Sequence, residues 1–413
     1  MELFENWQAT KETLLSGLPE SKKKILAPVL ENQKQQVMME TANAGTNNAG
    51  QIANFQKIVI PMLRRIIPGT IATELVGVQP MSGPVGLVYS TRFLFSESVN
   101  ATALPGTIAS PNDDIAAGDE VWGHTNSKMH RFYSTSDAAA PAGGPAAGTS
   151  TGVAAATADY EAFGGRAMTL EVLKQTVTAG SRKLQARWTP EAMQDLNASH
   201  GLNLEAEITA SLSAAVVSEI DNEIINDLIA LAGTTESFDM SGTFTGVPNY
   251  VGDRHAVLGV LINKVANEIA RKTRRGPANW IVVSPLVVSI LQSASKSVFA
   301  PAVAGSFEGP NNTKLVGTLN GSIKVYTYIY HDQGTEPILM GFKGGSGEMD
   351  AGYFYCPYIP LMSSGVVVDP NTFNPHVSLM TRYGKATFTN TTTSLGNSAD
   401  YYGRVSVANL SFV

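Results

Sequence analysis

Few residues in this chain have the types and spacing that catalysis requires. The stretch KGGSGE at 343–348 resembles a phosphate-binding loop, but it lacks the terminal Lys-Ser/Thr pair and a following helix, so we interpret it as a turn. SASKS at 293–297 has the spacing of a serine nucleophile and its lysine, without a partner motif elsewhere. We therefore predict no catalytic residue, and we predict that the chain is not an enzyme.

Metal-binding residue types gather in one segment of the chain. The two histidines His124 and His130 lie near four acidic residues, which are Asp113, Asp114, Asp119 and Glu120. Oxygen ligands of this kind suit a hard cation, but solvated surface side chains are the favoured interpretation. The single cysteine, Cys356, excludes an intrachain disulfide and a cysteine-based zinc site, and we expect it to be buried. We predict no metal and no cofactor.

The overall charge bears on the partners that the chain can bind. The net charge of −6 argues against a surface that wraps nucleic acid, because phosphate binding needs a basic excess. Two basic clusters, Arg64-Arg65 and KTRRG at 272–276, could contact phosphate, but we expect them to end helices or to bridge subunits. No apolar run of 18 residues and no signal peptide is evident, so we expect an intracellular origin and no membrane span.

The first predicted element of the chain is an amphipathic arm at residues 1–51. Its apolar residues recur at helical spacing, and Pro19 and Pro28 are expected to break the helix into short pieces. An arm of this length cannot bury its own apolar stripe, so it needs the body of the protein or another subunit.

A corner and a long excursion follow the arm. The stretch from Val76 to Phe93 contains Pro80 and Gly83-Pro84, and we interpret it as a hinge that leads into a strand at 86–95. The next seventy residues or so, to about Gly165, are rich in Ala and Gly and have little to bury. A segment of this length favours an extended loop that leans on a neighbouring subunit. A disordered linker between two domains is the alternative.

Two helices and one or two strands are predicted in the middle of the chain. Residues 167–189 alternate as strands, and 189–201 begins with Thr189 as N-cap and ends at Gly201. Asn203 then caps a long helix over 204–232. Its predicted packed face repeats every three or four residues and comprises Leu204, Ile208, Leu212, Val216, Ile220, Ile224, Leu228 and Leu231. Its other face is predicted to carry Glu205, Glu207, Glu219, Asp221, Glu223 and Asp227 in solvent.

The remaining chain combines helices with buried strands. Residues 259–294 predict a helix, a strand at 279–284 buried on both faces, and a helix from Pro285. Strands follow at 321–332 and 337–344, and the tail over 351–413 is rich in β-formers, so we expect it to close a sheet begun much earlier. An arm, a loop and a helical rod that all need outside partners favour an assembling structural protein.

Four long stretches carry a resemblance to a known family. They are ANFQKIVIPMLRRIIPGTIATELVGVQPMSGPVGLVY, EAMQDLNASHGLNLEAEITASLSAAVVSEIDNEIIN, EIARKTRRGPANWIVVSP and YCPYIPLM…VDPNTFNPHVSLMTRYG. Over most of 50–413 the chain resembles the major capsid proteins of T4-like tailed bacteriophages, which have an α+β, HK97-like fold. The resemblance implies a structural subunit of the virion, assembled in the host bacterial cytoplasm.

The resemblance also implies a division of the chain. It predicts an N-terminal arm (1–51), a lead-in to the peripheral domain (52–93), an extended loop (94–165), a peripheral domain with the spine helix 204–232 (166–255), an axial domain (256–345) and C-terminal strands of the peripheral domain (346–413). Pentamers and hexamers would form an icosahedral shell around double-stranded DNA, without sequence-specific binding. Portal, scaffold and decoration proteins are the other implied partners.

The same family is processed by a maturation protease that cuts after Glu. Glu20 and Glu40 fit its apolar-x-Glu context loosely, but we favour an arm that is retained and docks on neighbours. Three alternatives stay open: an encapsulin-like nanocompartment subunit, an enzyme whose site is built from unrelated loop residues, and a secreted binding module.

Overall fold

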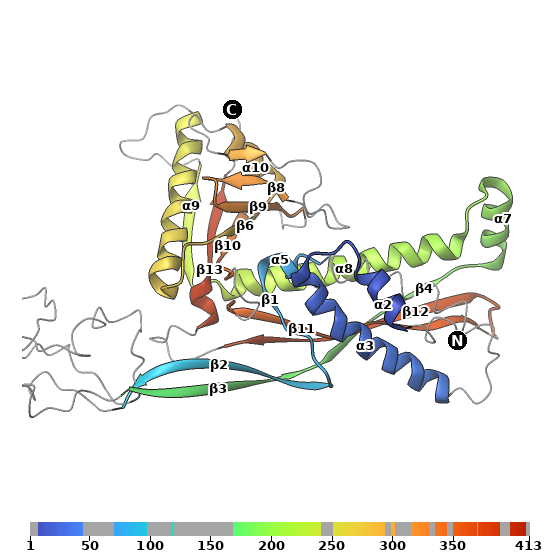
Figure 1. Cartoon of the computed structure of the whole chain (residues 1–413). Coiled ribbons are helices and arrows are strands. Elements are labelled where there is room, and N and C mark those ends of the chain that lie inside the picture. The colour runs from blue at the N-terminus through green and yellow to red at the C-terminus, as the bar shows by residue number, and fades with distance from the viewer. Residues whose placement is uncertain are drawn as a thin grey trace, which may run out of the picture.

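The computed structural model describes residues 7–43, 70–96, 118, 168–240, 251–293, 299–301, 315–329, 335–344, 350–369, 371–388 and 397–409. In these residues the chain forms a four-stranded sheet, a seven-stranded sheet and a two-stranded ribbon, joined by one long helix (Figure 1). The mixture of helices with largely antiparallel sheets confirms the predicted α+β class.

The helices are α2 (Trp7–Leu15), α3 (Glu20–Asn43), α5 (Ala72–Leu75), α7 (Pro190–His200), α8 (Leu204–Leu231), α9 (Val251–Thr273), α10 (Pro285–Ser293) and the 3-10 helix η3 (Ser398–Tyr401). The strands are β1 (Gly77–Val78), β2 (Val85–Phe95), β3 (Met168–Thr178), β4 (Gly180–Arg187), β5 (Thr234–Asp239), β6 (Trp280–Val283), β7 (Phe299–Pro301), β8 (Leu315–Leu319), β9 (Ile323–Thr327), β10 (Thr335–Gly341), β11 (Tyr353–Val368), β12 (Pro375–Thr387) and β13 (Tyr402–Ala408).

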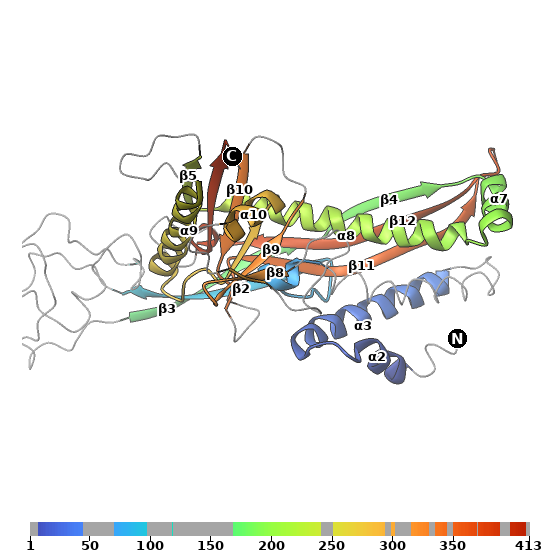
Figure 2. The ribbon, with the colours of Figure 1, turned by 90° about the horizontal axis from the view of Figure 1, so that it is seen from above.

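The spine helix α8 runs along the four-stranded sheet, whose order is β1-β11-β12-β4 (Figure 2). Its start is fixed by Asn203, whose side chain accepts a hydrogen bond from the Glu205 backbone N–H at 3.1 Å. The preceding α7 has Thr189 as N-cap, Pro190 in its first turn and Gly201 at φ 65° as its stop. Both helices therefore lie within one residue of their predicted bounds.

The seven-stranded sheet has the order β5-β13-β10-β6-β9-β8-β7 and stands beside one end of the spine helix (Figure 1). Helices α9 and α10 cover one of its faces, where Ile281, Val283 and Val405 are buried. Its other face joins the core that α8 enters, through residues such as Trp280 and Tyr326. The central strand β6 is buried at all four positions, as its apolar sequence predicted.

Two strands lie in a different sheet from the one expected. We predicted that residues 346–413 return to the spine-helix domain and that 166–255 stay within it, but β13 and β5 pair with each other inside the seven-stranded sheet. Val405 and Val407 of β13 are buried under α9, and this packing places β13 in the seven-stranded sheet. A short run of β-forming residues does not indicate which sheet the strand will join.

The corner predicted between Val76 and Phe93 joins the four-stranded sheet to the ribbon. Gly77 and Val78 pair with β11, and the backbone N–H groups of Gln79 and Met81 donate to the carbonyls of Tyr355 and Pro357, each at 3.0 Å. The chain then turns at Gly83-Pro84 and enters β2, which pairs with β3 along its whole length. The corner sets the direction of the ribbon, as predicted.

The arm helices α2 and α3 pack on the body of the same chain. Their buried residues Trp7, Ile25, Leu26, Val29 and Leu30 belong to the core that also contains the spine helix. The prediction that Pro28 breaks the helix is wrong, because α3 continues through it. Packing of the flanking side chains Leu26 and Val29 into the core holds the helix where a backbone hydrogen bond is missing.

The loop predicted at 94–165 lies outside the described residues, apart from residues 94–96 and 118. Within the described part of the chain, no helix combines the length and hydropathy that a membrane span needs.

Candidate functional site

The two sequence motifs that suggested chemistry serve structural contacts. Lys343, the first residue of the glycine-rich stretch, donates from Nζ to the backbone carbonyl of Thr73 at 2.6 Å. Ser293, the first residue of SASKS, has its Oγ 2.8 Å from Nδ1 of His255 at the α9–α10 contact. Residues 294–297 and 345–348, which complete the motifs, lie outside the described residues.

The metal-binding candidates also yield no site. His124, His130 and the four acidic residues around them lie outside the described residues. In the part of the chain that the structure describes, no three His, Cys, Asp or Glu side chains gather as ligands would. Cys356 is buried as predicted, and burial raises the pKa of its thiol to about 12, so it stays a protonated core residue.

The basic cluster at 272–276 is used within the chain. It ends α9 as predicted, with Arg271 and Lys272 in the last helical turn. Lys272 Nζ donates to Thr234 Oγ1 at 2.9 Å, and Arg275 pairs with Asp350 at 2.9 Å. The first contact holds the end of α9 on β5 of its own sheet, and the second links the residues after α9 to those before β11. The other cluster, Arg64-Arg65, lies outside the described residues.

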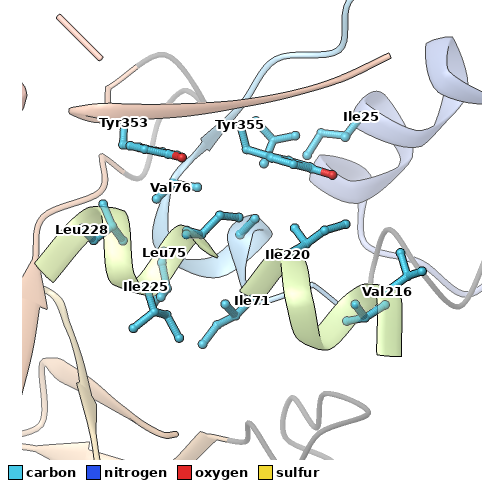
Figure 3. Packing of buried hydrophobic residues seen from close by; sticks show 14 of the residues in the cluster. Ile25, Ile71, Leu75, Val76, Val216, Ile220, Ile225, Leu228, Tyr353 and Tyr355 are labelled. Carbon is cyan, nitrogen blue, oxygen red and sulfur yellow. The ribbon is translucent and has the colours of Figure 1, made fainter. Parts of the chain in front are cut away.

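The short helix α5 is the junction at which the main parts of the chain meet (Figure 3). Ile71, Leu75 and Val76 point into a core lined by the spine helix on one side and by Tyr353 and Tyr355 of β11 on the other. Ile25 of α3 reaches the same core. One apolar cluster therefore joins the arm, the spine helix and the sheet.

Polar contacts fix the same junction. Glu74 of α5 forms an ion pair with Lys22 of the arm at 3.1 Å and accepts a hydrogen bond from the Tyr326 hydroxyl of the seven-stranded sheet at 3.3 Å. Because one carboxylate touches two different parts of the chain, α5 sets how the arm and the seven-stranded sheet sit on the spine helix.

Asp221 is an acidic residue that the sequence pattern misplaced. It was predicted on the solvent face of the spine helix, yet its side chain is only 1% exposed. Its Oδ1 accepts a hydrogen bond from the Ile71 backbone N–H at 2.9 Å, and Oδ2 is buried with no hydrogen-bond partner among the described residues. Burial raises the pKa of Asp221 from 3.8 to about 8, against the opposing effect of the Ile71 hydrogen bond, so the carboxyl is largely neutral at pH 7.

Three further acidic residues of α8 reach side chains of the four-stranded sheet, although all three stay partly exposed. Glu219 and Glu223 bind Arg182 of β4 at 2.9 and 2.5 Å, and Lys385 of β12 bridges Glu223 and Asp227 at 2.9 and 2.6 Å. Burial favours the neutral form of Glu223, but hydrogen bonds from Tyr383 and Lys385 outweigh it and lower its pKa. The predicted solvent face thus attaches the helix to the sheet.

The ribbon β2–β3 presents the largest group of exposed apolar side chains in the described residues. Cross-strand partners such as Phe93 and Leu170, or Thr91 and Val172, share one face. Leu170 and Val172 are 58% and 57% exposed. The exposed apolar residues of this outer face are Val85, Leu87, Tyr89, Phe93, Met168, Leu170 and Val172.

The inner face of the ribbon, opposite the outer face, packs at its base against the body of the chain. Val88 and Val177, which lie across from the outer face, are buried against Phe354, Cys356 and Phe388. The ribbon is thereby held to the body by the base of its inner face, and it then extends away from the spine helix (Figure 1). The outer face is therefore an apolar strip that stays exposed in the described part of the chain.

Sequence reasoning missed this strip, although its signal was present. Alternate residues from Val85 to Phe95 are apolar except for Thr91, which is the pattern of a strand with one apolar face. The burial of Asp221 had no comparable signal, because an aspartate inside a row of acidic residues is typical of a solvated face.

The proposed cleavage positions lie in the arm. Glu20 is the first residue of α3, exposed, and paired with Lys23 at 2.7 Å. Glu40 lies in the last turns of the same helix.

Known proteins resemble the chain over most of its length. The major capsid protein of Vibrio phage KVP40 is 31% identical, across 93% of this chain and 92% of that protein. The major capsid protein of Enterobacteria phage T4 is 28% identical, across 93% and 90%. Among solved structures, the capsid of Myoviridae phage XM1 aligns with a TM-score of 0.42 at 10% identity, covering 80% of this chain and 89% of that one.

A family model described as "Major capsid protein Gp23" matches residues 52–407, which is well over half of the sequence. The match includes the corner, the ribbon, the spine helix and both sheets. The chain belongs to the Gp23 family of major capsid proteins, the shell subunits of tailed phages.

Proposed function

We propose that the chain assembles as pentamers and hexamers into an icosahedral head shell that encloses the double-stranded DNA genome of a tailed phage. The observation that carries this proposal is the outer face of the ribbon. Contiguous exposed apolar surface is typical of a protein–protein interface, and a two-stranded ribbon is marginal in water without further packing. A neighbouring copy of the chain that covers this strip would satisfy both requirements.

The sheets support an assignment of the family's domains. The seven-stranded sheet with α9 and α10 would be the axial domain, and the four-stranded sheet with the spine helix would be the peripheral domain. The ribbon would be the base of the extended loop predicted at 94–165. With β5 and β13 in the seven-stranded sheet, the proposed axial domain takes residues from two separate parts of the chain, which are β5 to β10 and, after β11 and β12, the strand β13.

The charge supports a shell that encloses DNA without gripping it. The net charge of −6 disfavours tight binding to phosphates, and Lys272 and Arg275 are engaged in contacts within the chain. Assembly in the host bacterial cytoplasm, with portal, scaffold and decoration proteins as partners, completes the proposal.

The arm is proposed to stay in the particle. Cleavage after Glu40 would remove Ile25, Leu26, Val29 and Leu30 from the core that they share with the spine helix, whereas cleavage after Glu20 would remove only α2. The contacts of these residues within the same chain support an arm that is retained. The intact mass of the shell protein tests this proposal, because a truncated mass would identify the position that is cut.

Assembly of the full-length chain tests the proposed function. Negative-stain microscopy of the purified wild type should show closed shells, tubes or hexamer sheets. The double variant Leu170→Ser/Val172→Ser should keep the circular dichroism spectrum of the wild type and lose these assemblies. Gln175→Ser, on the opposite face of the same strand, is the matched control and should assemble. A wild type that stays monomeric at every salt concentration would contradict the proposal.

A further inference from the structure

The four-stranded sheet is basic, although the chain is acidic overall. Its strands β1, β4, β11 and β12 contain no Asp or Glu. All of their Lys and Arg residues belong to β4 and β12, which lie side by side and run towards α7 (Figure 2). These residues are Arg182, Lys183, Arg187, Arg382 and Lys385. The sheet is therefore a local basic region in a chain whose net charge is −6.

The two faces of this sheet offer their basic residues different surroundings. On the face that the spine helix covers, Arg182 and Lys385 form salt bridges to carboxylates of α8. Leu184 and Leu379 point to the same side and pack in the main core. Because successive residues of a strand point to opposite faces, the residues that alternate with these point away from α8. The basic face, as we term it, comprises Lys183, Arg187, His376 and Arg382.

Strand register places these residues in one row. Arg382 is opposite Ser181, two residues before Lys183, so the two cations are diagonal neighbours about 7–8 Å apart. Arg187 follows Lys183 by four residues, about 13 Å along the strand, and His376 lies directly across from Arg187. The row is therefore about 20 Å long, and one strand of duplex DNA presents a phosphate about every 3.4 Å of its axis. A row of this length can meet several phosphates of one strand.

The charges of the basic face are open to a partner. Lys183 and Arg187 are exposed, and Arg382 is half-buried. Among the described residues, none of the three forms a salt bridge to a carboxylate. Asp369, in the turn near Arg187, accepts a hydrogen bond from the Asn371 backbone N–H at 2.9 Å instead. The basic face thus keeps its positive charge, in contrast to the face under the spine helix.

The side chains of the basic face suit phosphate better than protein. The Arg382 guanidinium stacks on Tyr358, with Cζ 5.3 Å from the ring centroid, which leaves the N–H groups at its edge to donate. Ser181 and Gln185, on the same face, are exposed and neutral, and such side chains commonly donate to phosphate oxygens. The cores of protein interfaces are instead rich in apolar side chains and poor in charge. Met380 is the one large apolar residue that β4 and β12 place on this face, and it is half-buried.

We propose that the basic face contacts the phosphate backbone of the enclosed DNA without reading its sequence. The inference rests on the proposed function, which puts DNA inside the shell at high concentration. Each contact is weak, because three cations release few counterions, and the log–log slope of affinity against salt concentration should be about −3. Six to ten phosphate contacts would give a slope of about −5 to −9. A weak contact repeated in every subunit is consistent with the net charge of −6.

Binding of duplex DNA to the full-length, unassembled chain tests this contact. The probe is a fluorescent duplex of about 30 base pairs, followed by anisotropy from about 50 to 200 mM NaCl. Lys183→Gln/Arg187→Gln should weaken binding about tenfold or more and make the salt slope less negative by about 2. Lys324→Gln/Arg274→Gln removes two exposed charges elsewhere and is the matched control, which should bind like the wild type. All three proteins should share one circular dichroism spectrum.

Three results of this experiment would overturn the proposal. The first is a wild type that does not bind the duplex, and the second is an equal loss of affinity in both double variants. The third is tighter binding of a poly-glutamate peptide than of DNA at equal charge, which would assign the basic face to an acidic protein.

Lysine acetylation of assembled particles tests the contact in place. Lys183 should react several times more slowly in DNA-filled particles than in shells assembled without DNA, as measured by mass spectrometry. Lys324 serves as the internal control and should show a smaller change. Equal reactivity of Lys183 in filled and empty shells would overturn the proposal and leave the shell function standing. If the wild type forms no shell at any salt concentration, the chain encloses no DNA, and the shell function and the DNA contact are both wrong.

Discussion

The arm and the ribbon carry similar apolar stripes, but the stripe of the arm is buried and that of the ribbon is exposed. In the sequence, each is a short amphipathic segment that cannot bury its own stripe. In the structure, Leu26 of the arm is 1% exposed within the core, whereas Leu170 of the ribbon is 58% exposed. The difference arises at the corner between Val76 and Phe93, which attaches the ribbon by its inner face only. An unburied stripe therefore indicates an interface only after the contacts within the chain are known.

Matched leucine truncations would test this contrast most strongly. Leu26→Ala should reduce the free energy of unfolding by about 2–5 kcal/mol, because it leaves a cavity in the shared core. Leu170→Ala should change it by less than about 0.5 kcal/mol. Urea unfolding of the unassembled chains measures both. Similar losses for the two variants would mean that the ribbon is packed within the chain or that the arm is not.

The pH dependence of stability tests the burial of Asp221, which accepts the hydrogen bond from the Ile71 backbone N–H. The pKa of Asp221 is raised to about 8 in the folded chain, from 3.8, so between these values the folded state holds more protons than the unfolded state. Its contribution to stability is full below about pH 4 and falls by up to about 1.4 kcal/mol per pH unit as pH rises towards 8. Urea midpoints from pH 5 to 9 should show this fall for wild type and a flatter profile for Asp221→Asn. Parallel profiles would contradict the burial of an ionisable Asp221.

The charged row beneath the spine helix should give a smaller effect. Glu223→Gln weakens the contacts to Arg182, Tyr383 and Lys385 together, and we expect a loss of about 1–3 kcal/mol in the free energy of unfolding. Thermal unfolding at low and high salt measures it. A loss near zero would show that this row is solvated, as the sequence pattern had indicated.

The smallest expected effect is at the exposed end of that row. Glu219→Ala removes one of the two carboxylates that pair with Arg182, and the Glu219 side chain is 45% exposed. The loss should stay below about 1 kcal/mol and shrink further at high salt. A loss as large as that of Glu223→Gln would show that the two carboxylates act as one unit.

Much of the fold followed from local signals. The caps Thr189 and Asn203, the stop at Gly201 and the apolar run of β6 are determined by residues within a few positions of one another, and the α7, α8 and β6 predictions were confirmed. The resemblance supplied the family, which the matches confirm. The α+β fold class was likewise correct.

The errors share one cause, which is contact between residues far apart in sequence. Pro28 stays inside a helix because α3 packs into a core built by later segments. Asp221 is buried because Ile71, 150 residues earlier, offers it a backbone N–H. The sheet that takes β13 is likewise chosen by α9. A local pattern holds no information about such partners, so these features needed the structure.

The position of β13 affects how the chain is made. This strand, seven residues from Tyr402 to Ala408, lies between β5 and β10 inside the seven-stranded sheet, so the sheet stays open until the residues that follow β12 have been synthesised. Pairing at such separations in sequence is slow, and it leaves strand edges exposed in the meantime. A prematurely terminated chain therefore lacks the strand that completes this sheet. Without β13, β10 would have one open edge and β5 would have no neighbouring strand among the described residues.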